Sequence, residues 1–64
     1  MFKLKIRYDD ESMFYERLAS DAMHAEALSQ EELKGRAELV IIYRVHADGE
    51  HEEVRRFSKS QRSS

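Results

Sequence analysis

Apolar and charged residues alternate without exception over positions 2–8 of the chain. Strict alternation over seven residues is typical of a β-strand with one buried face and one face in water. The sequence therefore predicts a strand over residues 2–8 whose solvent-facing side is uniformly basic. Its apolar side holds Phe2, Leu4, Ile6 and Tyr8, and its basic side holds Lys3, Lys5 and Arg7.

Residues 9–28 follow a different period. Apolar side chains recur every three or four positions, which indicates a helix with one buried stripe. The acidic start of this segment suits the positive end of a helix dipole, and Asp9 or Asp10 is the expected N-cap. We therefore expect one long helix over residues 9–28. Its buried stripe would contain Phe14, Leu18, Ala22, Ala25 and Leu28.

A short, separate helical turn is predicted directly after the long helix. Ser29 and Glu32 have the spacing of a capping box, with a leucine on either side as in a hydrophobic staple. Gly35 follows at a position where a left-handed residue commonly ends a helix. The pattern thus predicts a helical turn over residues 30–34 that points in a new direction.

Residues 37–59 have the pattern of a β-hairpin. The run 39–45 is rich in β-branched and aromatic residues, and Asp48-Gly49 is a strong turn signal. Two registers stay open, because each places an opposite-charge pair across the strands. A two-residue Asp-Gly turn would set Arg44 opposite Glu53 and His46 opposite His51. A three-residue Ala-Asp-Gly turn with a bulge would set Arg44 opposite Glu52 and Leu39 opposite Phe57.

Together these elements predict an α+β fold with the order β-α-β-β. One long helix and a short helical turn would cover one face of a three-stranded sheet. The helical crossover allows the first strand to run parallel to the second, in the right-handed sense, and leaves open whether it borders the second or the third strand. Residues 1–59 would form a single domain, and residues 60–64 a polar, disordered tail.

The strand over residues 39–45 is apolar on both sides, whereas a sheet with one wet face usually alternates. Since one helix covers one side only, we expect Val40 and Ile42 on an open face that also carries Arg44 and Phe57. Long basic side chains could shield this face. Alternatively, the face or a sheet edge contacts a protein, which is either a second copy of the chain or another partner.

Size and composition favour such an association. The chain has 64 residues and no cysteine, so it has neither disulfides nor thiolate metal sites. Domains of this size bury only about 60% of their unfolded surface, which raises the expectation of a dimer or an obligate partner. No apolar run approaches the roughly 20 residues that span a bilayer, and the start does not resemble a signal peptide. We expect a soluble, cytoplasmic domain that does not bind membranes.

Charge is segregated along the chain, although the net charge is only −2. Residues 9–32 hold eight acids and one base, whereas residues 1–8 hold three bases and no acid. One interpretation is that an acidic helical layer and a basic sheet attract each other. Another is an acidic helix rim that docks on a basic protein, or imitates nucleic-acid phosphates as inhibitors of the mobile-element type do. This rim would consist of Glu11, Asp21, Glu26 and Glu31.

A basic sheet face could instead bind nucleic acid weakly. Its cations would contact phosphates, and Phe57 would stack on a base. The isoelectric point of about 5.9 makes nucleic acid an unlikely partner, because such modules are usually strongly basic. The cations of this face would be Lys3, Lys5, Arg7, Arg44 and either Arg55 or Arg56.

The sequence indicates no catalytic, cofactor or metal site. The acids lie on predicted surfaces without a cleft that could shift a pKa. Gly35 and Gly49 are explained by a cap and a turn, not by a phosphate-binding loop. His46 and His51 flank an exposed turn, where a metal would lack an outer shell of supporting residues. We therefore expect no enzyme and no small-molecule substrate.

The function predicted from the sequence is a small, non-enzymatic protein-binding module. It would act as an inhibitor or adaptor by occupying the surface of a partner. The predicted contact residues are Val40, Ile42, Arg44 and Phe57 on the open face and Glu11, Asp21, Glu26 and Glu31 on the helix rim.

Overall fold

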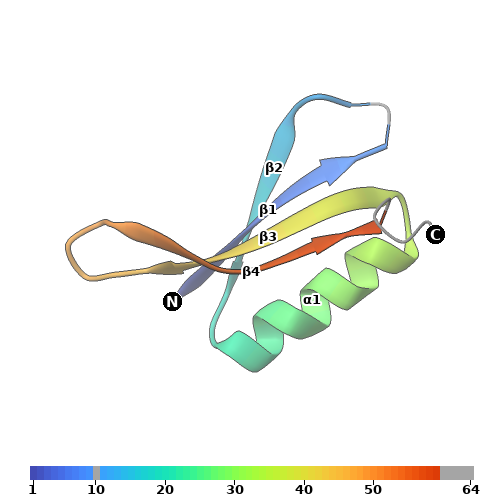
Figure 1. The fold of residues 1–64 in the computed structure, drawn as a ribbon. Helices are drawn as coiled ribbons and strands as arrows, with labels where there is room; N and C mark the ends of the chain where they lie inside the picture. The colour runs from blue at the N-terminus through green and yellow to red at the C-terminus, as the bar shows by residue number, and fades with distance from the viewer. Residues whose placement is uncertain (10, 60–64) are drawn as a thin grey trace.

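The computed structural model describes residues 1–9 and 11–59, which fold in the order strand, strand, helix, strand, strand (Figure 1). The polar tail predicted over residues 60–64 lies outside the described residues. The elements are β1 (Phe2–Tyr8), β2 (Phe14–Ala19), α1 (Ala22–Lys34), β3 (Ala37–Val45) and β4 (His51–Ser58).

The strands form one antiparallel sheet in the order β2-β1-β3-β4. The predicted α+β class is confirmed, but the sheet has four strands where three were expected. Because β2 reverses the chain before the helix begins, β1 runs antiparallel to β3, not parallel to it. The first strand therefore borders the one that follows the helix, and β2 and β4 form the two edges.

The strand β2 replaces the first half of the helix predicted over residues 9–28, so that prediction is wrong. Phe14, Glu16 and Leu18 lie on one side of β2, opposite alternate residues of β1. A spacing of four residues is close to one helical turn and is also a multiple of the strand period, so Phe14 and Leu18 fit both elements. Pairing with the basic side of β1 provides the neighbours that make the strand the stable choice.

The helix α1 begins after Asp21, well downstream of the predicted start. The backbone of Asp21 is extended, and its Oδ1 accepts a 2.8 Å hydrogen bond from the His24 amide. This is the geometry of an N-cap, which satisfies one of the free amides at a helix start. From there α1 runs unbroken to Lys34, so the separate turn predicted over residues 30–34 is wrong as well.

Ser29 is a buried residue in the middle of α1 and caps nothing. Its hydroxyl donates a 2.9 Å hydrogen bond to the carbonyl oxygen of Ala25, one turn earlier. A serine can satisfy its hydroxyl in this way inside a helix, so the capping-box spacing does not by itself mark a helix start. Gly35 ends α1 as predicted, but its φ of −95° is not left-handed.

The β3–β4 hairpin turns through Ala47, Asp48 and Gly49, the three-residue alternative. The Gly49 amide bonds to the His46 carbonyl, and Gly49 has a positive φ of 94°. Arg44 accordingly lies opposite Glu52. A register shift between Ile42 and Tyr43 leaves Val54 as an extra residue in β4, so Leu39 pairs with Ser58 and not with Phe57.

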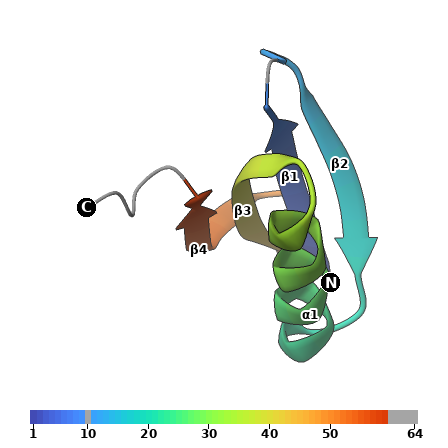
Figure 2. The same cartoon turned by 90° about the vertical axis from the view of Figure 1, so that its right-hand side faces the viewer.

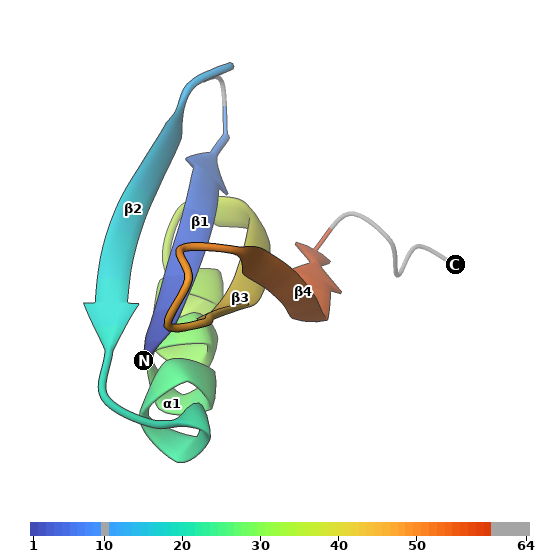
Figure 3. The ribbon, with the colours of Figure 1, turned by 90° about the vertical axis from the view of Figure 1, so that its left-hand side faces the viewer.

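The core lies between α1 and one face of the sheet. Figures 2 and 3 show α1 over the central strands, with β4 to one side, and α1 packs on β1, β2 and β3. Small residues at Ala19 and Ala25 allow the helix to approach the sheet closely. The large buried side chains of this core are Leu4, Ile6, Val40 and Ile42.

Candidate functional site

The sheet face that α1 leaves uncovered, here called the open face, is the reverse of the one predicted. Val40 and Ile42 were expected on it, but they are 0% and 4% exposed and belong to the core beneath α1. Both sides of β3 are apolar, so its own pattern does not show which side meets the helix. The pairing of β3 with β1 determines which side meets the helix. Ile42 and Val40 lie opposite Leu4 and Ile6, which belong to the core.

The other two residues predicted for the open face also lie on the helix side. Phe57 is opposite Val40 and packs against the core. Arg44 is exposed, and its guanidinium carbon lies 5.8 Å from the centre of the Phe2 ring. The four predicted residues therefore share one face, but it is the face that carries α1.

The centre of the open face is apolar and largely shielded. Ile41 is only 6% exposed, although no helix covers it. Its cross-strand neighbours are Lys5 on β1 and Arg56 on β4. Long basic side chains can cover apolar surface with their methylene groups while their charges stay in water. The shielding that the sequence suggested for Val40 and Ile42 therefore applies to Ile41.

The edge of the open face on β2 is apolar and accessible. Phe14 is 43% exposed and lies opposite Arg7, whereas Leu18 is 59% exposed and lies opposite Lys3. The sequence reasoning missed both as surface residues, because it placed them on the buried stripe of a helix. Residues 14–18 show no alternation of apolar and polar side chains that could have revealed them, because Glu16 shares a side of β2 with Phe14 and Leu18.

Lys3, Lys5 and Arg7 of β1 form the basic row of the open face, and each of them has a partner within the chain. Lys3 lies 3.5 Å from Glu16, and Arg7 lies 3.6 Å from Glu38. The ammonium nitrogen of Lys5 lies 5.7 Å from the centre of the Tyr43 ring, within reach of a cation–π interaction. Ion pairs this exposed contribute little to stability, but they leave the face with a small net charge.

Glu53 and Arg56 form a two-bond pair on β4. Arg56 donates from Nε and from Nη2 to the two carboxylate oxygens of Glu53, each at 3.1 Å. These hydrogen bonds lower the pKa of the Glu53 carboxyl and raise that of the Arg56 guanidinium. Each side chain therefore favours the charged form of the other.

The acidic residues predicted as a helix rim do not form one surface. Glu11 lies in the β1–β2 connection, where it accepts a 2.9 Å hydrogen bond from the Tyr15 hydroxyl and raises the pKa of that phenol. Asp21 is the N-cap of α1. Glu26 pairs with Arg55 of β4, and Glu31 is exposed on α1. Only the last three belong to the helix or its cap.

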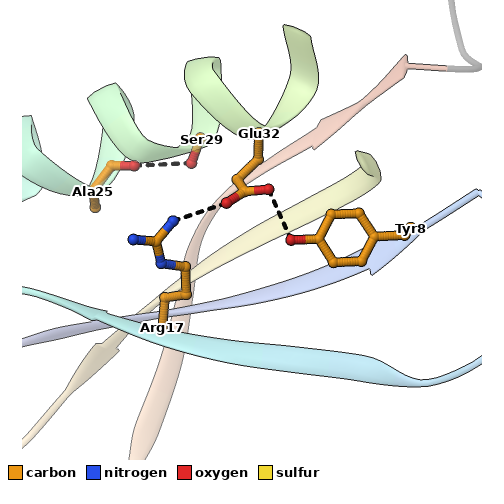
Figure 4. Close-up of polar contacts among 5 residues, drawn as sticks. All are labelled: Tyr8, Arg17, Ala25, Ser29 and Glu32. Carbon is orange, nitrogen blue, oxygen red and sulfur yellow. Dashed lines mark hydrogen bonds and ion pairs between the residues drawn. The ribbon is translucent and has the colours of Figure 1, made fainter. Parts of the chain in front are cut away.

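Instead, acids of α1 hold the helix on the sheet. Figure 4 shows Glu32 of α1 between the side chains of Tyr8 and Arg17: its Oε1 accepts from the Tyr8 hydroxyl at 2.8 Å, and its Oε2 accepts from Arg17 Nη1 at 2.8 Å. The hydrogen bond to Glu32, together with burial, raises the pKa of the Tyr8 phenol. Attraction between an acidic helix and a basic sheet, one of the alternatives from sequence, is thus visible at Glu32 and Glu26.

A cavity of about 330 Å³ opens beside the first turns of α1, on the side of β4. Its walls are mainly apolar and include Phe2, Met23, Ile42 and Val54, with Glu26 and Arg55 at its border. The helix lies over the central strands, and β4 lies to one side of it (Figure 2). Met23 and Val54 are exposed there.

The two histidines near the hairpin turn are separated. His46 Nε2 lies 3.0 Å from a carboxylate oxygen of Glu52, whereas His51 lies opposite Val45 with its ring 6.3 Å from that of Tyr43. Within residues 1–9 and 11–59, no group of three or more His, Asp or Glu side chains is arranged to hold a metal ion.

No helix in the described part of the chain is both long and apolar enough to cross a membrane. Comparison of the chain with models of protein families, with curated proteins and with solved structures finds no significant match to any of them.

Proposed function

We propose that the chain is a small, non-enzymatic binding module that acts as an inhibitor or adaptor by placing its open face against a partner protein. The observation that carries the proposal is the pair of exposed apolar side chains Phe14 and Leu18 on that face. Both lie on the edge strand β2, and the basic residues Lys3 and Arg7 of β1 separate them from the apolar residues of β3. Accessible apolar residues rimmed by charge are typical of protein-binding surfaces.

The charges on the open face indicate the chemistry of the partner. Lys5 lies at the centre of the basic row, and its ammonium nitrogen lies over the ring of Tyr43. A partner with an apolar surface that carries a carboxylate would cover Phe14 and Leu18 and pair with Lys5. Such complementarity orients the complex and speeds association more than it adds affinity.

The two alternatives from the sequence have less support. Binding of nucleic acid would require free cations, but Lys3 and Arg7 on the open face lie beside Glu16 and Glu38. Imitation of a nucleic acid would require spaced free carboxylates, but Glu26 and Glu32 are bound to Arg55 and Arg17 of the sheet.

The proposal is tested by comparing three immobilised proteins in capture from a cell lysate. These are the wild-type chain, Leu18→Glu on the open face, and Met23→Glu on α1 as a matched control, since both positions are exposed. A true partner is retained by the wild type and by Met23→Glu and is lost with Leu18→Glu. With that partner purified, calorimetry should show a dissociation constant at least about tenfold higher for Leu18→Glu.

Capture that survives both Leu18→Glu and Phe14→Glu would contradict the use of the open face. A gel shift with short RNA and DNA at about 50 mM salt provides the second arm, because phosphate contacts are strongest at low salt. A shift that disappears with Lys5→Glu would overturn the protein-binding proposal in favour of nucleic acid.

A further inference from the structure

The edge strand β4 has a charge order that reverses along its length. Two acids, Glu52 and Glu53, precede Val54, and two bases, Arg55 and Arg56, follow it. Charged residues on an edge strand normally discourage pairing with another chain. Here the order favours one partner, because an antiparallel copy of the same strand can set Arg56 of one copy opposite Glu53 of the other.

The bulge in β4 determines which residues lie on each side of the strand. Glu53 and Arg56 lie on the open face, because they are opposite Tyr43 and Ile41. Arg55 lies on the helix side, opposite Ile42, and Val54 lines the cavity on that same side. Two consecutive residues therefore share the helix side, which a regular strand does not allow.

Two copies of a strand that pair antiparallel are related by a two-fold axis perpendicular to the sheet, so residues opposite each other lie on the same side. For β4, an axis between Val54 and Arg55 satisfies this condition at every position. It sets residue 53 opposite 56, 52 opposite 57, and 51 opposite 58, and thus overlaps the whole of His51–Ser58. A shift of the register by one residue in either direction places helix-side residues opposite open-face residues.

We propose that the outer edge of β4, which has no neighbouring strand among residues 1–9 and 11–59, pairs antiparallel with β4 of a second copy in this register. The pairing joins two four-stranded sheets into one. Glu53 of each copy then lies opposite Arg56 of the other, on the open face. Within one chain the same two side chains bind each other, so both lie on the same side of β4. The strand β4, which lies to one side of α1, becomes the middle of the joined sheet (Figure 3).

The other edge of the sheet lacks this complementarity. In β2, Glu16 is on the open face and Arg17 is on the helix side, so two copies related by the same symmetry never set one opposite the other. Glu16 would face itself, or Arg17 would face itself, in the registers centred on these residues. Like charges directly opposite each other destabilise a pair of strands. The association is therefore specific to β4.

The proposed dimer is symmetric, so each substitution changes two cross-strand pairs at once. This makes the pairing testable with charge reversals. Sedimentation equilibrium of the wild-type chain should show a dimer. Glu53→Arg and Arg56→Glu should each weaken it at least about tenfold, since each replaces two opposite-charge pairs with two like-charge pairs. An equimolar mixture of the two variants should form a heterodimer of wild-type affinity, because all cross-strand charges are again opposite. A loss of folding, checked by circular dichroism, could not produce this recovery on mixing.

Glu16→Arg, which reverses a charge on the opposite edge, is the matched control and should leave the dimer unchanged. The proposal is overturned if the wild type stays monomeric up to millimolar concentration, if the single variants dimerise as the wild type does, or if their mixture shows no recovery. Leu18→Glu, which tests the open face, lies on β2 and should not alter the dimer. The two proposals can therefore fail separately.

Discussion

Glu32 on α1 accepts a 2.8 Å hydrogen bond from the hydroxyl of Tyr8 on β1, a residue 24 positions earlier in the chain. The same carboxylate binds Arg17 of β2, so one side chain connects the helix to two neighbouring strands (Figure 4). We expect Glu32→Ala to lower the free energy of unfolding by about 1–2 kcal/mol, because Tyr8 and Arg17 lose their acceptor. Urea unfolding measures this. Glu31→Ala, an exposed neighbour, should change it by less than about 0.5 kcal/mol.

The Tyr8–Glu32 hydrogen bond should also make stability depend on alkaline pH. The bond exists with the protonated phenol, and it raises the pKa of Tyr8 above its ordinary value of about 10. Its contribution is complete below pH 10 and is lost as the pH rises through the raised pKa, because the unfolded chain then releases the proton first. Urea unfolding between pH 9 and 11 should show a steeper fall for the wild type than for Tyr8→Phe; equal slopes would contradict this account.

Two substitutions test where α1 begins. The sequence suggested Ser29 as a cap, whereas the N-cap in the structure is Asp21. Asp21→Ala should lower the free energy of unfolding by about 1 kcal/mol, because it removes the N-cap acceptor of the His24 amide. Ser29→Ala should be nearly neutral, because its hydroxyl donates only to a carbonyl within the same helix. A large effect of Ser29→Ala together with a neutral Asp21→Ala would place the helix start near residue 29.

The two sides of the sheet should respond very differently to a new carboxylate. Ile42→Glu buries an unpaired charge under α1 and should prevent stable folding. Leu18→Glu places the same group on the exposed edge of β2 and should keep the wild-type circular dichroism spectrum. A folded Ile42→Glu variant would show that α1 covers the other side of the sheet.

The hairpin turn depends on Gly49, whose φ of 94° is unfavourable for other residues. Gly49→Ala should lower the free energy of unfolding by about 1 kcal/mol, although nothing lies within 4 Å of the added methyl group. Thermal unfolding followed by circular dichroism measures this, with Asp48→Ala as a comparison. An unchanged midpoint for Gly49→Ala would indicate that the hairpin uses a different turn.

The elements predicted correctly are those whose local sequence pattern is compatible with only one type of secondary structure. Strict alternation identified β1, and Asp48-Gly49 identified the hairpin turn. The error over residues 9–28 arose because Leu18 and Ala22 are one helical turn apart while the chain changes from strand to helix between them, at Ser20 and Asp21. The polar pair at 20 and 21 was the available signal of that change.

The candidate surfaces could be predicted only in part, since they depend on pairing across the sheet. Val40, Ile42 and Phe57 were correctly grouped on one face, but the side that meets the helix follows from their neighbours Leu4 and Ile6. The bulge at Val54 leaves no trace in the hydrophobic pattern, yet it places Glu53 and Arg56 on the same side. Exposure of Phe14 and Leu18 became apparent only with β2 in place.

The β3–β4 hairpin extends past the N-terminal end of α1, so the turn at residues 47–49 stands away from the rest of the molecule (Figure 1). A spin label or fluorophore attached at Ala47, which is exposed, would touch neither Leu18 nor the middle of β4. Its rotational correlation time would lengthen whenever the molecule joins a larger assembly. This protruding tip therefore gives the small domain a natural attachment point for following its associations in solution without altering the surfaces that make them.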